Sequence, residues 1–309
     1  MKQTIIPPCL KEGDLVAITA TARKVSAYEM APAKALLQSW GLRVIVPDGL
    51  YAEQHQMAGS DAHRTTMIQQ LLDNPEVKAI FCARGGYGTV RMVDTIHWER
   101  FLQHPKWIIG YSDVTVLHST LRQMQVASIH GIMPINIPAD ALQVDYPALA
   151  SLHQLLFDGK VEYKQLGDRK LFRAGNAQGA IVGGNLSMLY SQLASPSDIN
   201  TDNTILFIED LDEYLYHIDR MMMALKRAGK LAHLQGLIVG AMSDMHDNTI
   251  PFGYTAEEIV WDAVKEYHYP VVMNCPFGHI GTENRALPLG SNASLTVNSI
   301  GESAVLCSL

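Results

Sequence analysis

The stretch Gly110-Tyr111-Ser112-Asp113-Val114-Thr115 decides how this chain is expected to fold. An apolar run before it, Trp107-Ile108-Ile109, predicts a buried strand, and residues 114–122 after it are typical of a helix. Ser112 is therefore expected on a sharp strand-to-helix turn, as in a nucleophile elbow, where the hydroxyl projects from the sheet and the helix N-terminus faces an oxyanion. Val114 stands where the elbow pattern has its second glycine. The alternative interpretation is that Ser112 and Asp113 only cap the helix.

Outward from this turn, the first half of the chain alternates between apolar runs and helical patterns. Strands are expected at residues 14–20, 42–47, 77–82, 107–109 and 127–130, and helices at 25–40, 61–72, 89–96 and 114–122. Strands separated by helices predict a parallel sheet with right-handed crossovers. Functional groups in such sheets gather at the carboxyl ends of the strands, where Ala20, Arg84 and Ser112 are placed.

The second half begins after a stretch with weaker periodicity, residues 145–178. Strands are then expected at 179–185, 204–208, 234–242 and 271–273, helices at 212–228 and 255–267, and short antiparallel strands at 286–289, 293–297 and 304–307. We therefore expect an α/β protein with a first domain over residues 1–150, a linker over 151–178 and a second domain over 179–309.

Composition limits the classes of function. The chain has 309 residues, 48% of them hydrophobic and 18% charged, so it can build a sizeable core. Its net charge of −7 argues against a nucleic-acid or anionic-membrane partner. The four cysteines lack metal-ligand spacing and indicate reduced thiols in a cytosolic protein. The sequence has neither a run of about 18 apolar residues nor an N-terminal signal-peptide pattern, so no membrane span is expected.

A nucleophilic serine needs a base, and the base needs an orienting acid. Of the twelve histidines, His279 is favoured because it lies between Gly278 and Gly281 just beyond a strand end; His130, which precedes Gly131, stays open as the alternative. Glu209 is the best placed acid because it ends an apolar strand, where a carboxylate is seldom found without a partner. Its rivals are Asp210 and Glu213, and Glu209 could also simply cap the next helix.

The loop Arg84-Gly85-Gly86-Tyr87-Gly88 has two interpretations. Its backbone N–H groups could hold a phosphate, although it lacks the Lys-Ser/Thr of a P-loop and the GxGxxG spacing. Alternatively, the loop forms one half of an oxyanion hole, and the Asp113 N–H forms the other half.

These blocks occur together in a known family, and the chain resembles the LD-carboxypeptidases over nearly its whole length. The matching blocks, in order, are Ala58-Gly59-Ser60-Asp61 with Arg64, residues 74–80, Arg84-Gly85-Gly86-Tyr87-Gly88, Gly110-Tyr111-Ser112-Asp113, His130-Gly131, Gly183-Gly184-Asn185, Glu209-Asp210 and Gly278-His279. The resemblance implies a flavodoxin-like N-terminal domain carrying Ser112. It also implies a smaller, β-rich α/β C-terminal domain carrying Glu209 and His279.

The resemblance further implies a function. Ser112 would be the nucleophile, His279 the general base and Glu209 its orienting acid, with an oxyanion hole from the Gly86 and Asp113 backbone and with no metal or other cofactor. The expected activity is that of a cytoplasmic serine peptidase of murein recycling, which removes the terminal D-alanine from murein tetrapeptides. Family members are usually dimers, so a homodimer is expected.

Two other functions stay open beside this one. The sister group, the microcin C immunity peptidases, cuts an amide in a peptidyl-nucleotide; the chain shows no aromatic-rich insert for a nucleobase. A non-catalytic nucleotide-binding module could be built on the glycine loop. A carboxypeptidase must also bind the terminal carboxylate of its substrate, and Arg84, Asn185 and Arg285 are the candidates expected near the site.

Overall fold

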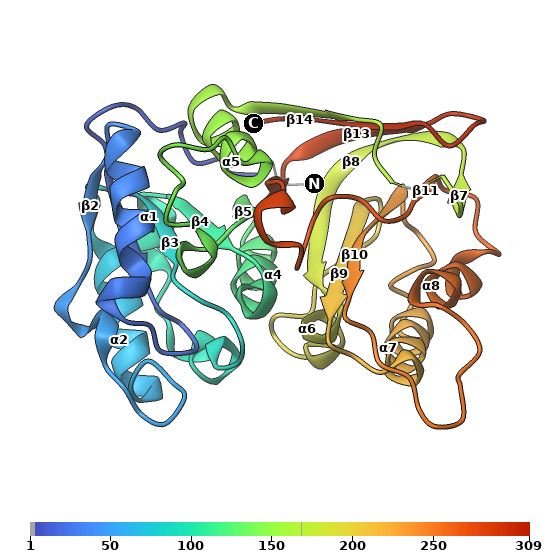
Figure 1. The fold of residues 1–309 in the computed structure, drawn as a ribbon, viewed down its shortest axis with the longest axis horizontal. Helices are drawn as coiled ribbons and strands as arrows, with labels where there is room; N and C mark the ends of the chain where they lie inside the picture. Colours follow the sequence, from blue (N-terminus) through green and yellow to red (C-terminus); the bar gives the residue numbers. More distant parts are fainter. Residues whose placement is uncertain (1–3, 168) are drawn as a thin grey trace.

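The computed structural model describes residues 4–167 and 169–309, which build two sheets flanked by helices (Figure 1). The first half of the chain forms β1 (Leu15–Thr19), α1 (Ala27–Ser39), β2 (Arg43–Ile45), α2 (Asp61–Asp73), β3 (Val77–Cys82), α3 (Glu99–Gln103), β4 (Trp107–Gly110), α4 (Thr115–Gln123) and β5 (Ser128–His130). Five 3-10 turns interrupt it, at Asp48–Tyr51, Thr89–Arg91, Val93–Thr95, Ser112–Val114 and Pro134–Asn136.

The first sheet has six strands in the order β12-β5-β4-β3-β1-β2. Its first five strands in the chain pair in parallel and follow the order 2-1-3-4-5, which is the flavodoxin-like arrangement. The sixth strand, β12 (Leu287–Leu289), comes from the far end of the chain and pairs antiparallel with β5, with Leu287 opposite His130. The expected flavodoxin-like parallel sheet is therefore confirmed, with one strand borrowed from the second half.

The second half forms a larger mixed sheet in the order β6-β14-β13-β8-β9-β10-β11-β7, with β6 (Lys160–Lys164) and β7 (Phe172–Arg173) at its two edges. Its elements are β8 (Gly175–Asn185), α6 (Leu186–Ser191), β9 (Ile205–Leu211), α7 (Leu215–Arg227), β10 (Gly236–Ser243), α8 (Ala256–Val264), β11 (Val271–Val272), a 3-10 turn at Gly281–Glu283, β12, β13 (Asn292–Val297) and β14 (Ser303–Ser308). Strands β8 to β11 are parallel, and the outer strands are antiparallel. The β-rich α/β second half is thus confirmed.

The stretch expected as a linker, residues 151–178, is folded where the structure describes it. It contains most of α5 (Pro147–Asp158), both edge strands β6 (Lys160–Lys164) and β7 (Phe172–Arg173), and the start of β8. The side chains of β6 alternate between exposed and buried, as in a half-buried edge strand. The helix expected over residues 89–96 is also different, because it forms two short 3-10 turns.

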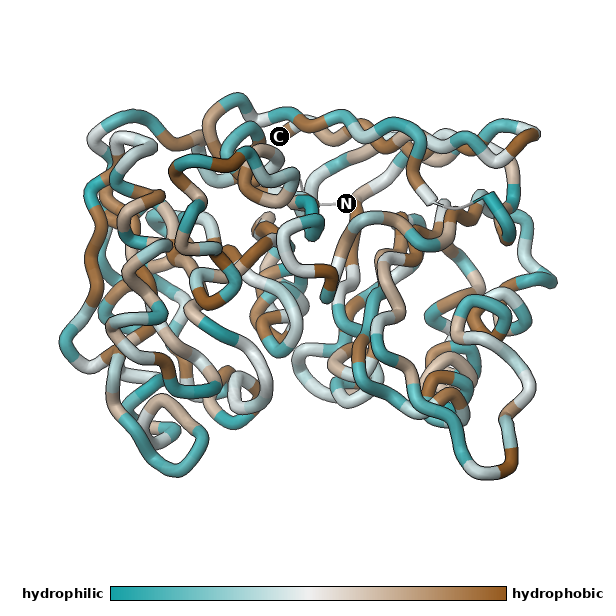
Figure 2. Tube along the Cα trace, in the orientation of Figure 1, coloured by the Kyte–Doolittle hydropathy of each residue, from teal (hydrophilic) through white to brown (hydrophobic). Residues whose placement is uncertain are grey.

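One of the buried hydrophobic clusters spans the two halves. Side chains of the first sheet, such as Val16 and Ile109, belong to the same buried cluster as Phe207, Phe277 and Leu295 of the second half. In Figure 2, hydrophobic stretches follow the inner strands, whereas hydrophilic residues predominate in the outer loops. This shared core fixes the carboxyl ends of β4 and β9 relative to each other, and these ends carry the candidate site.

Candidate active site

Ser112 lies at the sharp turn between β4 and α4. Its φ angle is +63°, the strained left-handed conformation that is typical of a nucleophile elbow. Gly110 explains why Val114 can replace the usual second glycine: a Cβ at Gly110 would lie 2.8 Å from a Val114 methyl group. The elbow therefore keeps its close packing by having the glycine before the serine and the larger side chain after it.

The glycine loop after β3 lies directly against Ser112. A Cβ at Gly85 would lie 3.2 Å from the Ser112 Oγ and 3.4 Å from the Asp113 backbone nitrogen. The buried Asp113 carboxylate accepts a hydrogen bond of 2.9 Å from the Thr89 N–H, which ties the turn to the end of this loop. Burial raises the pKa of Asp113. The Asp113 N–H lies in the first turn of a helix, where backbone donors lack helical acceptors.

Glu209 and His279 form a hydrogen-bonded pair. The fully buried Glu209 carboxylate lies 2.7 Å from the His279 Nδ1 through its Oε2. Gly278 makes this contact possible: its φ is +108°, and a Cβ there would lie only 2.6 Å from the same carboxylate oxygen. Burial disfavours the charged imidazole, but the hydrogen bond and charge of Glu209 outweigh it and raise the pKa of His279 above its usual value.

The rival acids have other partners. Asp210 lies next to Glu209 on β9 and so points to the opposite face of the sheet, where it accepts hydrogen bonds from the Asn185 side chain and the Ser187 N–H. Burial and the charge of Glu209 raise the pKa of Asp210 to about 7. Glu213 pairs with His217 at 2.6 Å. Of the three candidate acids, Glu209 is the one that contacts His279.

Tyr111 joins His279 to the elbow. Its ring packs against the His279 ring with 4.8 Å between centroids, and it immediately precedes Ser112. Its hydroxyl donates to the Asn136 side chain at 3.1 Å. Because Tyr111 contacts His279 and immediately precedes Ser112, the His279 imidazole from the second half lies beside the Ser112 turn from the first half.

His130, the alternative base, lies behind Tyr111. It is fully buried between the rings of Tyr111 and Phe207, at 5.7 and 4.8 Å between centroids. No carboxylate forms an ion pair with His130 within the described chain. Burial lowers the pKa of His130 well below its usual value, and the nearby His118 and His279 lower it further. His130 therefore lacks the acid partner that His279 has.

The three residues expected to bind a carboxylate lie in different surroundings. The Arg84 guanidinium is 3.9 Å from Glu29. Asn185 is buried, caps α6 and donates to Asp210. Arg285 stacks on Tyr163 at 5.9 Å. Substrate binding by these residues stays a prediction.

Arg23, which is not among the residues expected from the sequence, also lies at the glycine loop. This side chain follows β1 and lies over Gly86, far from it in the sequence. A position after a strand of a parallel sheet was the signal that could have found it.

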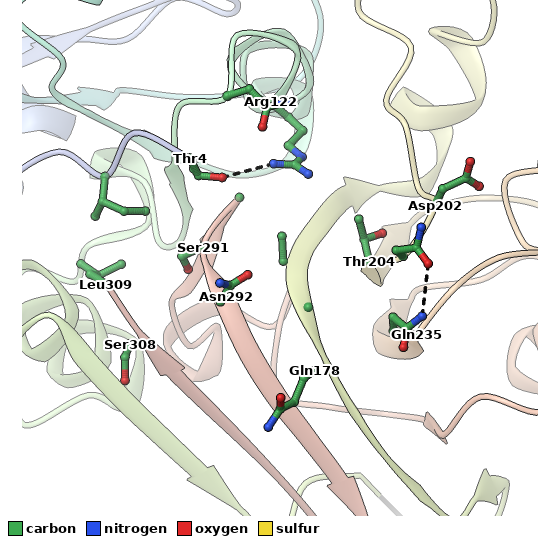
Figure 3. A pocket seen from close by; sticks show the side chains of 16 residues that line it. Thr4, Arg122, Gln178, Asp202, Thr204, Gln235, Ser291, Asn292, Ser308 and Leu309 are labelled. Atoms are coloured by element: carbon green, nitrogen blue, oxygen red, sulfur yellow. Dashed lines mark hydrogen bonds between the residues drawn. The ribbon is translucent and has the colours of Figure 1, made fainter. Parts of the chain in front are cut away.

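A cavity lies away from these residues. It has a volume of about 740 Å³ and opens at the other end of β9 and β10, where Thr204 and Gln235 precede the strands (Figure 3). Its polar lining includes Arg122, which donates to the Thr4 hydroxyl at 3.5 Å.

In residues 4–167 and 169–309 we find no cluster of three or more His, Cys, Asp or Glu able to hold a metal ion. The described helices include none long and apolar enough to cross a membrane.

Both halves of the chain match models of one protein family. The family model of the LD-carboxypeptidase N-terminal domain matches residues 16–131, and that of the C-terminal domain matches residues 178–295. A relative from Bacillus subtilis (strain 168), described as a probable murein peptide carboxypeptidase, is 33% identical over 307 residues, covering 97% of this chain and 93% of its own.

Solved structures share the fold. The crystal structure of muramoyltetrapeptide carboxypeptidase from Oxalobacter formigenes superposes with a TM-score of 0.84 at 26% identity, covering 96% of this chain and 99% of the other. The microcin C7 self immunity protein MccF, in complex with aspartyl sulfamoyl adenosine, superposes with a TM-score of 0.81 at 18% identity, covering 99% of this chain and 98% of the other. At that identity the second likeness concerns the fold alone.

Proposed function

This chain belongs to the LD-carboxypeptidase family, and we propose that it is a serine carboxypeptidase that releases the terminal D-alanine from murein tetrapeptides. The observation that carries the proposal is the buried Glu209–His279 pair packed against Tyr111, next to the strained Ser112 turn. The names of the relatives support the substrate class. As the family resemblance implies, we further propose that the enzyme is cytoplasmic, acts in murein recycling and works as a homodimer.

The proposed chemistry begins with the tautomer of His279. Because Nδ1 faces the Glu209 carboxylate at 2.7 Å, Nδ1 carries a hydrogen and Nε2 remains an acceptor. Nε2 takes the proton of the Ser112 hydroxyl as its oxygen attacks the scissile carbonyl, and Glu209 stabilises the imidazolium that forms. The carbonyl oxygen becomes an oxyanion, for which the Gly86 and Asp113 N–H groups are the proposed donors.

The second half of the reaction returns the enzyme to its starting state. The imidazolium donates its proton to the leaving nitrogen, the carbon–nitrogen bond breaks, and D-alanine departs from an acyl-enzyme on Ser112. A water molecule then attacks the ester while Nε2 takes its proton. The shortened peptide leaves as a carboxylic acid, and the proton returns to Ser112. No step needs a cofactor.

The experiment compares two peptides as substrates of the purified protein. Wild type should release free D-alanine from the tetrapeptide, and Ser112→Ala should lose this activity by several orders of magnitude while keeping its melting temperature. A pentapeptide ending in two D-alanines should be a poor substrate, because its scissile carbonyl belongs to a D-configured centre that would misplace it in the oxyanion hole. Equal release from both peptides, or an active Ser112→Ala variant, contradicts the proposal.

One observation favours a microcin-immunity-type activity as the second candidate. Tyr214 and Tyr216, which follow β9 and its Glu209, are 43% and 38% exposed and pack together at 5.6 Å between centroids. Exposed rings can stack on a nucleobase. Aspartyl sulfamoyl adenosine is therefore the third test compound. If the protein cleaves it and leaves the tetrapeptide intact, the second candidate replaces the first. If the protein leaves both the tetrapeptide and aspartyl sulfamoyl adenosine intact, the nucleotide-binding alternative is supported.

A further inference from the structure

Arg23 reaches across the glycine loop that lies against Ser112. It stands in the loop after β1, where its N–H donates to the Gly85 carbonyl at 3.4 Å and its backbone forms a bridge with Met57. Its side chain covers Gly86 so closely that a Cβ at Gly86 would lie 2.6 Å from both the Cδ and the Nε of Arg23. Gly86 has a φ of +105°, so its missing side chain serves both the turn and this contact.

Arg23 differs from the other cations around this loop because it has no acidic partner. Lys24 pairs with Glu53 at 2.6 Å, and Arg84 approaches Glu29 at 3.9 Å. Arg64 and Arg91 both pair with Asp61. Within the described residues, no carboxylate comes within 4 Å of the exposed Arg23 guanidinium. Its five N–H donors are therefore available to an anion from outside the chain.

The position of Arg23 fits the spacing of a carboxypeptidase substrate. A Cβ at Gly85 would lie 3.2 Å from the Ser112 Oγ, and Gly86, which Arg23 covers, is the next residue, about 3.8 Å further along the chain. In the substrate, the free carboxylate likewise lies one residue beyond the carbonyl that Ser112 attacks. A guanidinium binds such a carboxylate through two parallel hydrogen bonds.

We propose that Arg23 binds the terminal carboxylate of the residue that is released, and thereby restricts the enzyme to C-terminal cleavage. This assignment rests on the proposed function and names the residue that gives it carboxypeptidase specificity. It differs from the sequence-based candidates: Asn185 is used within the fold, and Arg285 is stacked on Tyr163. Arg84 is the remaining rival because it belongs to the same loop, but Glu29 already lies beside it.

The test measures kcat/KM for the tetrapeptide and for the same peptide with an amidated C-terminus. Wild type should prefer the free acid. Arg23→Gln should lower kcat/KM for the acid about 10- to 100-fold, as expected for a lost charge-assisted hydrogen bond, and leave the amide nearly unchanged. Arg23→Lys should recover part of the preference, because it restores the charge without the fork of donors.

Lys24→Gln is the matched control. It removes one positive charge from the neighbouring residue, so it reproduces the change in net charge, and it should keep the wild-type preference for the acid. If Arg23→Gln also keeps that preference, the assignment is overturned, and a loss in Arg84→Gln instead would transfer the role to Arg84. If wild type releases neither D-alanine from the acid nor D-alanine amide from the amide, the proposed function fails and the assignment falls with it. If wild type is active and Arg23→Gln keeps the same preference for the acid, only the assignment is overturned.

Discussion

Replacing Gly278 by alanine tests whether the backbone beside His279 must lack a side chain. The φ of +108° at this position strains any residue other than glycine, at a cost of about 1–3 kcal/mol. The new Cβ would also lie 2.6 Å from the Glu209 Oε2, so the buried carboxylate must move. Losing its charge-assisted hydrogen bond to His279 costs about 1.5–3 kcal/mol more. We therefore expect Gly278→Ala to lower the free energy of unfolding by about 2.5–6 kcal/mol.

Gly281→Ala is the control because it shares the backbone constraint without the clash. Its φ is +61°, and a Cβ there would have no neighbour within 4 Å, so the expected cost is about 1–2 kcal/mol. Denaturant unfolding gives the two free energies, and D-alanine release gives the two activities. Gly278→Ala should lose most of its kcat, whereas Gly281→Ala should keep it. Equal stabilities together with full activity of Gly278→Ala would refute the reasoning.

Glu209→Gln should lower kcat about 10³- to 10⁴-fold, and, because Glu209 raises the pKa of His279, the acid limb of the pH–rate profile should move to lower pH. An acid limb that stays at the wild-type pH in Glu209→Gln would contradict the raised pKa of His279. The same raised pKa means that the pair stabilises the wild-type fold most below pH ~6.5, and that this contribution is lost as pH rises through the folded-state pKa of His279. His279→Ala should be as inactive as Ser112→Ala, and the double variant no worse, whereas His130→Ala should keep substantial activity; the reverse order would make His130 the base. Gly85→Ala should lower kcat at least 10-fold with little change in melting temperature, because its Cβ would press on Ser112 at 3.1–3.2 Å; an unchanged kcat would remove the glycine loop from the site.

The sequence predicted those parts of the fold that have local signals. The apolar run before Ser112, the strand that ends at Glu209 and the alternation of strands and helices all leave short-range patterns, and the parallel first sheet followed from them. The strand β12 was itself expected, at residues 286–289, but its pairing with β5 left no local signal, since it joins residues far apart in the chain. The edge strand β6 did have an alternating pattern, but it is only five residues long.

The sequence predicted some residues near the candidate site and not others, because only some of them leave a local signal. Residue type and position at a strand end suggested Glu209 and His279, and the structure brings these two together. The choice between Glu209 and Asp210 needed the direction of each side chain, which the pleat of β9 sets. The position of Arg23 after a strand is a local signal, but its place over Gly86 could not be inferred, because it depends on packing between β1 and β3 in the folded sheet.

A serine-directed fluorophosphonate measures whether the Glu209–His279 pair activates the Ser112 hydroxyl. Intact-protein and peptide mass spectrometry measure how fast the reagent adds and which residue it modifies. The account predicts one adduct, on Ser112, formed rapidly by wild type and at least about 100-fold more slowly by His279→Ala and Glu209→Gln. Modification of a different residue, or labelling of Ser112 at the wild-type rate in the His279→Ala variant, would contradict it.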